Sequence, residues 1–198
     1  MKKKMYFVWA NPKKESLTAK IVNSMKKQGL ENGYEVSELD LYRSGFEGSL
    51  EVMDHPVWDS KEQNYSQKVY DLFDEVKGSD TVVFVFPIWW YSFPAILKGY
   101  IDRVWNYGLA YGNGSKIPVE KVRWVALAGD TEQSFKKRDN DKYLEHFTIN
   151  SISSYCGITD AKLEIIYDTL IFDKEPAGSE AYKTLFKRVN TIIDDLDK

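Results

Sequence analysis

The sequence predicts an α/β protein in three layers: a doubly wound, five-stranded parallel sheet between two layers of helices. Short runs rich in β-branched and aromatic residues alternate with longer segments in which apolar residues recur at helical spacing. One of the short runs, residues 81–86, is apolar without alternation, which indicates a strand covered on both faces, and residues 122–128 predict another buried strand. Because the 198 residues contain no internal repeat or linker, we expect a single domain over residues 1–198.

The first half of the chain begins with a predicted strand at residues 5–9. A helix follows over residues 16–28, with Ser16 in the N-cap position. After an Asn-Gly turn, residues 35–41 alternate and predict the second strand. Residues 44–64 have no clear period, and connections longer than about 12–15 residues are usually functional or mobile.

The middle of the chain repeats this alternation. Apolar residues at i, i+3, i+4 and i+7 predict a helix over residues 65–77, and the buried strand 81–86 follows it. The next helix is expected over residues 94–106, with Pro94 in its first turn, where a missing N–H is tolerated. Residues 122–128 then predict the fourth strand along the chain.

The last third predicts a helix over residues 139–155, a strand at 163–167 and a helix over 179–196. Parallel strands joined by helices have both faces of the sheet covered, which gives the three-layer architecture. Ligands of such sheets bind beyond the carboxyl ends of the strands, near the point where the strand order reverses.

Composition and charge exclude several classes of function. The 27 basic and 30 acidic side chains give a net charge of -3, which favours neither a nucleic acid nor an anionic membrane as partner. The single cysteine, Cys156, excludes an intrachain disulfide and a Cys-cluster metal site, and we interpret it as a packed thiol. The two histidines, His55 and His146, are far apart in sequence, so no metal site is predicted.

No segment resembles a membrane anchor or a secretion signal. The apolar residues 5–10 after a basic stretch are too few for a signal sequence, and no cleavage site follows them. The longest apolar stretch, residues 81–91, is shorter than the ~18 residues of a transmembrane helix. The sequence therefore predicts a cytoplasmic protein without membrane insertion.

The loop at residues 10–18 opens the first predicted helix. Free N–H groups and the positive end of the helix dipole favour an anion there, and Ser16 and Thr18 add hydroxyl donors. The loop matches neither GxGxxG nor the P-loop pattern. A phosphate is the ligand that this loop would bind, but a capped helix start that binds nothing explains the loop equally well.

The loop at residues 86–94, with the sequence FPIWWYSFP, carries three consecutive aromatic residues at the end of a central strand. Trp89, Trp90 and Tyr91 cannot all face one core, so at least one ring should lie in the ligand crevice. Stiff backbone N–H groups beside a flat aromatic wall suit a planar heteroaromatic ring. The alternative is that these rings close the sheet end or form a subunit contact.

Residues 86–104 (FPIWWYSFPAILKGYIDRV), continuing to GLAY at 108–111, resemble the NAD(P)H:quinone oxidoreductase family. This flavodoxin-like family includes the modulator of drug activity B proteins and the small oxidoreductases associated with potassium efflux systems. The LDLY sequence at 39–42, the chain length and the strand order agree with it.

The resemblance implies a flavin. FMN is favoured because 198 residues leave little chain beyond the core to cover an adenine, and FAD is the alternative. The implied cofactor-binding residues are Asn11, Ser16, Leu17 and Thr18 for the phosphate, Pro87, Ile88, Trp89, Trp90 and Tyr91 for the ring, and Ala128, Gly129 and Asp130 in a third loop. Asp130 departs from the Thr- and Gly-rich pattern of the family, and a carboxylate beside a flavin disfavours the anionic reduced form.

The resemblance also implies an activity: NADPH or NADH reduces the flavin, which passes two electrons to a quinone or similar aromatic acceptor in a ping-pong cycle. Tyr143 and His146 are the catalytic candidates, although the residues between them and the third loop match no family pattern. Tyr107 and Tyr111 are expected to line the acceptor pocket, across the interface of a homodimer.

Two other functions stay open: a flavin-binding electron carrier, and a regulatory subunit of a partner such as a cation efflux system. A carrier should have a strongly acidic docking face, which a net charge of -3 does not favour. Lys98, Asp102 and Arg103 are explained by a solvated helix face or an intersubunit salt bridge as well as by catalysis.

Overall fold

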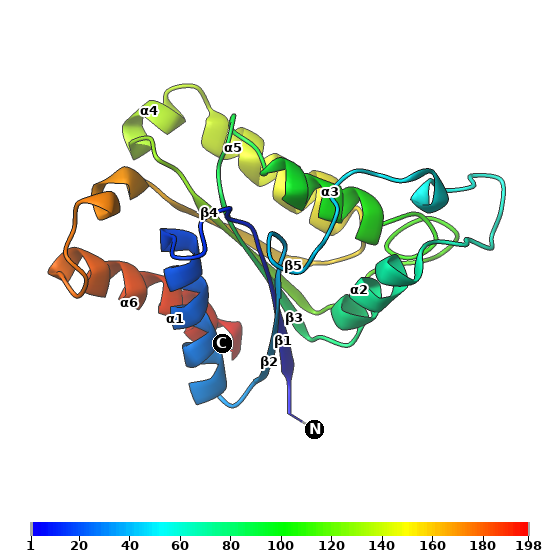
Figure 1. The fold of residues 1–198 in the computed structure, drawn as a ribbon, viewed down its shortest axis with the longest axis horizontal. Coiled ribbons are helices and arrows are strands. Elements are labelled where there is room, and N and C mark those ends of the chain that lie inside the picture. The colour runs from blue at the N-terminus through cyan, green and yellow to red at the C-terminus, as the bar shows by residue number, and fades with distance from the viewer. Residues whose placement is uncertain (1, 198) are drawn as a thin grey trace.

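The computed structural model describes residues 2–197, which form a five-stranded parallel sheet in the order β2-β1-β3-β4-β5 (Figure 1). The strands are β1 (Lys4–Trp9), β2 (Glu35–Asp40), β3 (Thr81–Pro87), β4 (Lys121–Leu127) and β5 (Asp160–Ile166). The chain builds β1 and β2 in one direction and then returns past β1 to β3. The strand order therefore reverses between β1 and β3, which places the ligand-binding edge at their carboxyl ends.

Two helical layers cover the sheet, as predicted. The helices are α1 (Leu17–Glu31), α2 (Gln67–Lys77), α3 (Ala95–Val104), α4 (Glu132–Lys136), α5 (Asn140–Glu145) and α6 (Glu180–Asp194). Figure 1 shows α1 and α6 side by side on one face, and α2, α3 and α5 on the other. Each long helix has an apolar stripe that faces the sheet, as in α6, where Leu185, Val189 and Ile193 are buried.

Some element boundaries differ from the prediction. Strand β5 begins at Asp160 and not at 163. The prediction missed its first three residues because Asp160 and Lys162 are polar and this edge strand is only half covered. Pro94 is the N-cap of α3 and not a residue of its first turn. The helix predicted over 139–155 is α5 followed by a π-helical segment, His146–Ser154. Helix α4 was not predicted, because its five residues are too few for a period.

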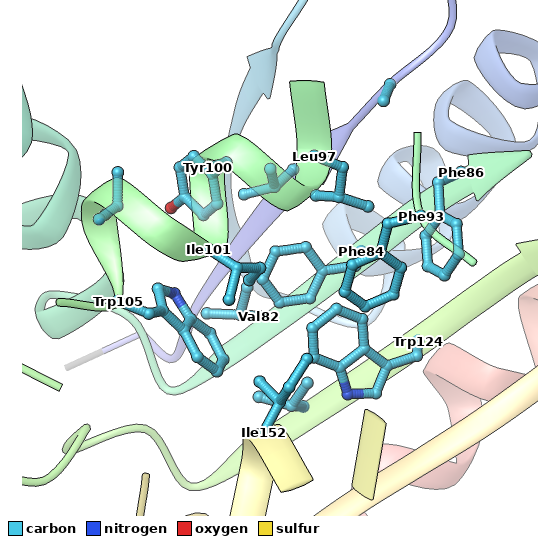
Figure 2. Packing of buried hydrophobic residues seen from close by; sticks show 14 of the residues in the cluster. Val82, Phe84, Phe86, Phe93, Leu97, Tyr100, Ile101, Trp105, Trp124 and Ile152 are labelled. Atoms are coloured by element: carbon cyan, nitrogen blue, oxygen red, sulfur yellow. The ribbon is translucent and has the colours of Figure 1, made fainter. Parts of the chain in front are cut away.

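A stack of aromatic rings joins the centre of the sheet to the loop after β3 (Figure 2). The Trp124 ring lies between Phe84, at a centroid distance of 4.1 Å, and Phe93, at 5.3 Å, and the rings of both pairs are stacked nearly parallel. The indole Nε1 of Trp124 donates a hydrogen bond of 3.0 Å to the Ser153 hydroxyl, so its polar group is satisfied. Phe93 therefore anchors the far side of the 86–94 loop in the core.

The long 44–64 connection is fixed by a buried ion pair. The Arg103 guanidinium on α3 contacts Asp54 at 2.6 Å, and both side chains are almost completely buried. The Asp54 carboxylate also accepts the Ser66 N–H at 2.7 Å. The expectation of a solvent-exposed or intersubunit Arg103 was wrong: its charge is needed inside to neutralise Asp54. Lys98 and Asp102 are exposed on the same helix, as a solvated face would have them, and they form an ion pair with each other at 2.6 Å.

The two ends of the described chain lie close together, at the amino ends of the strands. Lys3, just before β1, pairs with Asp197 at 2.7 Å, and the Tyr34 hydroxyl donates to the same carboxylate at 2.9 Å. The amino ends of the strands lie opposite their carboxyl ends, where the topology places the ligand. Among residues 2–197, no helix has both the length and the apolar character required to cross a bilayer.

Candidate functional site

Two adjoining cavities open at the carboxyl ends of β1, β3 and β4. The larger has a volume of about 640 Å³ and the smaller about 300 Å³. Ile88 and Gly129 line both, so the two cavities meet between the second and third loops. Together they form one crevice at the switch point of the sheet, where the topology predicts a ligand.

The crevice brings together all three predicted cofactor-binding loops. Eight of the predicted residues line the larger cavity: Asn11, Ser16, Leu17, Thr18, Pro87, Ile88, Trp89 and Gly129. The smaller cavity is lined by Ile88, Trp90, Tyr91, Ala128, Gly129, Asp130 and Phe135. Segments far apart in sequence are therefore placed around one space.

The start of α1 forms the anion-binding end of the crevice. Ser16 caps the helix, since its hydroxyl accepts the Ala19 N–H at 3.2 Å. The N–H groups of Leu17 and Thr18, the first two helical residues, have no intrahelical acceptor. Thr18 is buried, and its Oγ1 accepts a hydrogen bond of 3.0 Å from the Asn11 amide, which leaves the hydroxyl hydrogen free to donate. These donors suit an anion such as a phosphate.

The aromatic loop forms a tight turn with backbone strain. The main chains of Trp89 and Ser92 exchange two hydrogen bonds of 3.1 Å each. Trp90 and Tyr91, between them, have φ angles of 50° and 57°, in the left-handed region that L-residues with large side chains rarely adopt. Their N–H groups find no acceptor within residues 2–197, and the Trp90 side chain is 96% exposed. Such strain at a crevice is typical of a functional site.

The third loop is braced by the chain that follows β5. The Ala128 carbonyl accepts hydrogen bonds of 3.0 Å from both the N–H and the hydroxyl of Thr169. The carboxylate of Asp130 accepts the Thr131 N–H at 2.9 Å, so the unexpected acidic group is hydrogen-bonded to its own loop. Gly129 is packed against Leu170, which a Cβ would approach to 3.2 Å.

Sequence reasoning missed several residues of the crevice. Phe135 on α4 is buried, lines the smaller cavity and lies 5.5 Å from the Tyr91 ring. The larger cavity is also lined by Lys13 and Lys20 from the first loop and helix, and by residues after β5: Thr169, Leu170, Phe172, Asp173, Glu175 and Tyr182. Only the fold brings these residues to the site, because no local motif marks them.

The two catalytic candidates do not lie in the crevice. Tyr143 and His146 are exposed on α5 and the π-helical segment, and they line neither cavity. The Tyr143 ring stacks on Phe147 with an interplanar angle of 3°. Within residues 2–197 no cluster of three or more His, Cys, Asp or Glu side chains is arranged to bind a metal ion.

Tyr107 and Tyr111 belong to a separate aromatic cluster. Their rings lie 5.9 Å apart, and they contact the exposed rings of Trp58, at 5.1 Å from Tyr107, and Tyr155, at 5.3 Å from Tyr111. Neither tyrosine lines the two cavities of the crevice. Within one chain, the structure therefore does not bring these two tyrosines to the crevice.

A parallel sheet in this order with a crevice at its β1–β3 switch point defines a flavodoxin-type α/β protein. Residues 3–189 match the family described as flavodoxin-like fold, and the chain belongs to that family. It is 44% identical over 193 residues to a protein of Escherichia coli named uncharacterized NAD(P)H oxidoreductase YcaK, with 98% of each chain covered.

More distant proteins agree. The chain is 32% identical to ribosyldihydronicotinamide dehydrogenase (quinone) of Pongo abelii, over 91% of this chain and 86% of that one. The solved structure of an NAD(P)H:quinone oxidoreductase from Methanothermobacter marburgensis has the same fold, with a TM-score of 0.88, 23% identity, and coverage of 100% of this chain and 98% of that one. The resemblance seen in the sequence is confirmed, and the chain is an oxidoreductase.

Proposed function

We propose that the protein is a flavin-dependent NAD(P)H oxidoreductase that transfers two electrons to a quinone or a similar aromatic acceptor, with FMN as its cofactor. The observation that carries this proposal is the junction of the two cavities at Ile88 and Gly129. It places an anion-binding helix start beside a rigid turn with free N–H groups. A flavin nucleotide has both chemical parts, a phosphate and a planar ring with hydrogen-bond acceptors.

The donor set of the crevice fits this cofactor. The N–H groups of Leu17 and Thr18, with the Thr18 hydroxyl, would hold the phosphate, and the N–H groups of Trp90 and Tyr91 would hold the acceptor atoms of the ring. When bound, the flavin supplies the two-electron redox chemistry, and the protein supplies position and electrostatics. The strained turn is already formed, so these donors need not reorganise when the ring binds.

The residues around the smaller cavity determine what reaches the ring. Trp90 and Tyr91 offer flat aromatic surfaces on which a nicotinamide or a quinone would stack. Buried Phe135 excludes water from one side. Because the two cavities form one crevice, NAD(P)H and the acceptor would occupy it in turn, which is the ping-pong order. We assign no step to Tyr143 and His146, since they lie outside the crevice.

We further infer a homodimer in which the partner completes the acceptor pocket with Tyr107 and Tyr111. The support is that these tyrosines lie outside the crevice of their own chain, in a cluster with exposed Trp58 and Tyr155, which are 56% and 67% exposed. Exposed aromatic clusters of this kind are typical of protein interfaces.

The proposal is tested on the purified protein. We expect a flavin absorption spectrum, release of FMN on denaturation, and oxidation of NADPH or NADH that depends on an added quinone. Chromatography of the released flavin distinguishes FMN from FAD, and comparing the two nicotinamides establishes the preference. A protein that binds neither flavin contradicts the proposal. A flavin-loaded protein without turnover would instead be an electron carrier or a regulatory subunit.

A further inference from the structure

Arg43 lies just after β2, yet its guanidinium reaches the loop that follows β1. It donates hydrogen bonds to the carbonyl oxygens of Asn11, at 2.6 Å, and Pro12, at 3.2 Å. Its planar group also lies over the Trp9 ring, with 4.9 Å between Cζ and the ring centroid. Arg43 lines neither cavity, so these contacts act on the loop and not on a ligand.

Asp40, the last residue of β2, holds Arg43 in this orientation. Its carboxylate forms an ion pair with the guanidinium Nε and also accepts the N–H groups of Tyr42 and Arg43, at 3.1 Å and 3.3 Å. The guanidinium is thus fixed by a carboxylate on one side and by two carbonyl oxygens on the other. A lysine ammonium has no planar fork and cannot reproduce this set of contacts.

The contacts of Arg43 fix the orientation of the peptide groups in the loop after β1. In a trans peptide the C=O and the N–H point in opposite directions, so a Pro12 carbonyl directed at Arg43 directs the Lys13 N–H away from it. That N–H donates to the Asn11 side-chain oxygen at 2.9 Å. The Asn11 amide in turn donates to Thr18 Oγ1 at 3.0 Å, which leaves the Thr18 hydroxyl hydrogen available to an anion.

We propose that Arg43, oriented by Asp40, is a positioning residue for the phosphate-binding end of the crevice. It keeps two electronegative carbonyl oxygens turned away from a bound phosphate, and it fixes Asn11 and therefore the donor at Thr18. This inference rests on the proposed flavin nucleotide. It adds two residues, Arg43 and Asp40, that affect phosphate binding only by positioning the loop after β1.

The test compares FMN with riboflavin, which has the same ring and no phosphate. Both are titrated into the full-length protein after its flavin has been removed, with fluorescence as the readout. We expect Arg43→Met to weaken FMN binding by roughly tenfold or more and to leave riboflavin binding unchanged. Arg43→Lys should not restore FMN binding, although it restores the charge.

Asp40→Asn separates positioning from simple charge. It removes a negative charge near the phosphate, so through-space electrostatics predicts tighter FMN binding, whereas loss of the Arg43 orientation predicts weaker binding. Arg188→Met is the matched control, because Arg188 also pairs with a carboxylate, Glu164, and donates to a carbonyl, that of Ile165, at 3.0 Å. It should change neither titration.

An unchanged ratio of FMN to riboflavin affinity in Arg43→Met overturns the inference. So does full recovery in Arg43→Lys, tighter FMN binding in Asp40→Asn, or an equal loss of riboflavin, which would mean general damage to the fold. If the unaltered protein binds riboflavin as tightly as FMN, the phosphate site of the proposed function fails, and this inference fails with it.

Discussion

Asp54 is the residue on which the position of the 44–64 connection depends. Burial raises the pKa of its carboxyl, but hydrogen bonds from Ser66 and Arg103 outweigh this effect, so the pKa lies below its ordinary value of 3.8. A carboxyl with a lowered pKa in the folded protein stabilises the fold above the pKa of the unfolded chain. This contribution is lost as the pH falls through the lower, folded pKa.

We expect Asp54→Asn to lower the free energy of unfolding at pH 7 by about 3 kcal/mol, because it leaves the buried Arg103 without its main counter-ion. Because the variant lacks this carboxyl, its free energy of unfolding should also fall less steeply below pH 4 than that of the parent protein. Urea unfolding over a pH series measures both effects. Asp102→Asn, which breaks an exposed pair, should cost less than about 1 kcal/mol, and an equal cost for the two variants would contradict this account.

Cys156 illustrates a residue whose chemistry is suppressed by packing. It is 4% exposed, and burial raises the pKa of its thiol to about 11. We therefore expect no reaction with a thiol-specific disulfide reagent at pH 8 in the native protein, and complete reaction in denaturant. Fast labelling of the folded protein, with a single modified thiol found by mass spectrometry, would show that this region opens.

At the scale of the element, the turn from Trp89 to Ser92 combines strain with exposure. L-residues in the left-handed region cost about 1–2 kcal/mol each, and Trp90 does not offset this cost by burial, since its side chain is 96% exposed. The aromatic stack of Trp124 and Phe93 holds the turn from behind. On the proposed function, this cost accompanies a turn that holds the two N–H groups where a flavin ring would meet them.

Trp90→Gly should raise the free energy of unfolding by up to about 1 kcal/mol, because glycine adopts positive φ without strain. The same variant should bind flavin more weakly, since the aromatic wall is lost and the turn is less rigid. Trp90→Ala is the control: it removes the ring and keeps the strain, so flavin binding should fall without a gain in stability. A destabilised Trp90→Gly variant would show that the turn is not strained.

The sequence predicted elements well where one physical signal dominates. Strands β3 and β4 are largely apolar because both faces of the sheet are covered there, and their bounds were close to those predicted. The start of β5 was missed because Asp160 and Lys162 lie on a half-exposed edge strand, where polar residues hide the period. Helix α3 was predicted, but the buried partner of Arg103 was not, since Asp54 is 49 residues away.

At the scale of the whole molecule, the topology explains why the candidate site could be predicted only in part. The first and second loops contain local signals, a capped helix start and three consecutive aromatic residues. Phe135, Leu170 and Tyr182 carry no such signal, and they reach the crevice only because β4 and β5 end beside it. Arg43 was missed for the same reason: it follows β2, and only the fold brings its guanidinium to the loop after β1.

The proposed dimer can be tested by complementation. If Tyr111 acts on the partner's crevice, Trp90→Ala and Tyr111→Ala should each reduce quinone-dependent NAD(P)H oxidation. Co-expressed, the two variants should recover activity, because a mixed dimer contains one crevice with both residues intact. Activity should approach half that of the parent protein per mixed dimer. No recovery, with mixed dimers shown by mass spectrometry, would place Tyr111 in its own chain's site or outside any site.

The ion pair between Lys3 and Asp197 brings the two ends of the described chain together, on the edge of the sheet away from the crevice. A short Gly-Ser linker could therefore join them and make the backbone a closed ring. New ends could then be opened between Asn113 and Gly114, the exposed residues of the turn at 112–115. We expect such a circular permutant to retain its flavin spectrum, since every strand keeps its neighbours and only the order of synthesis changes.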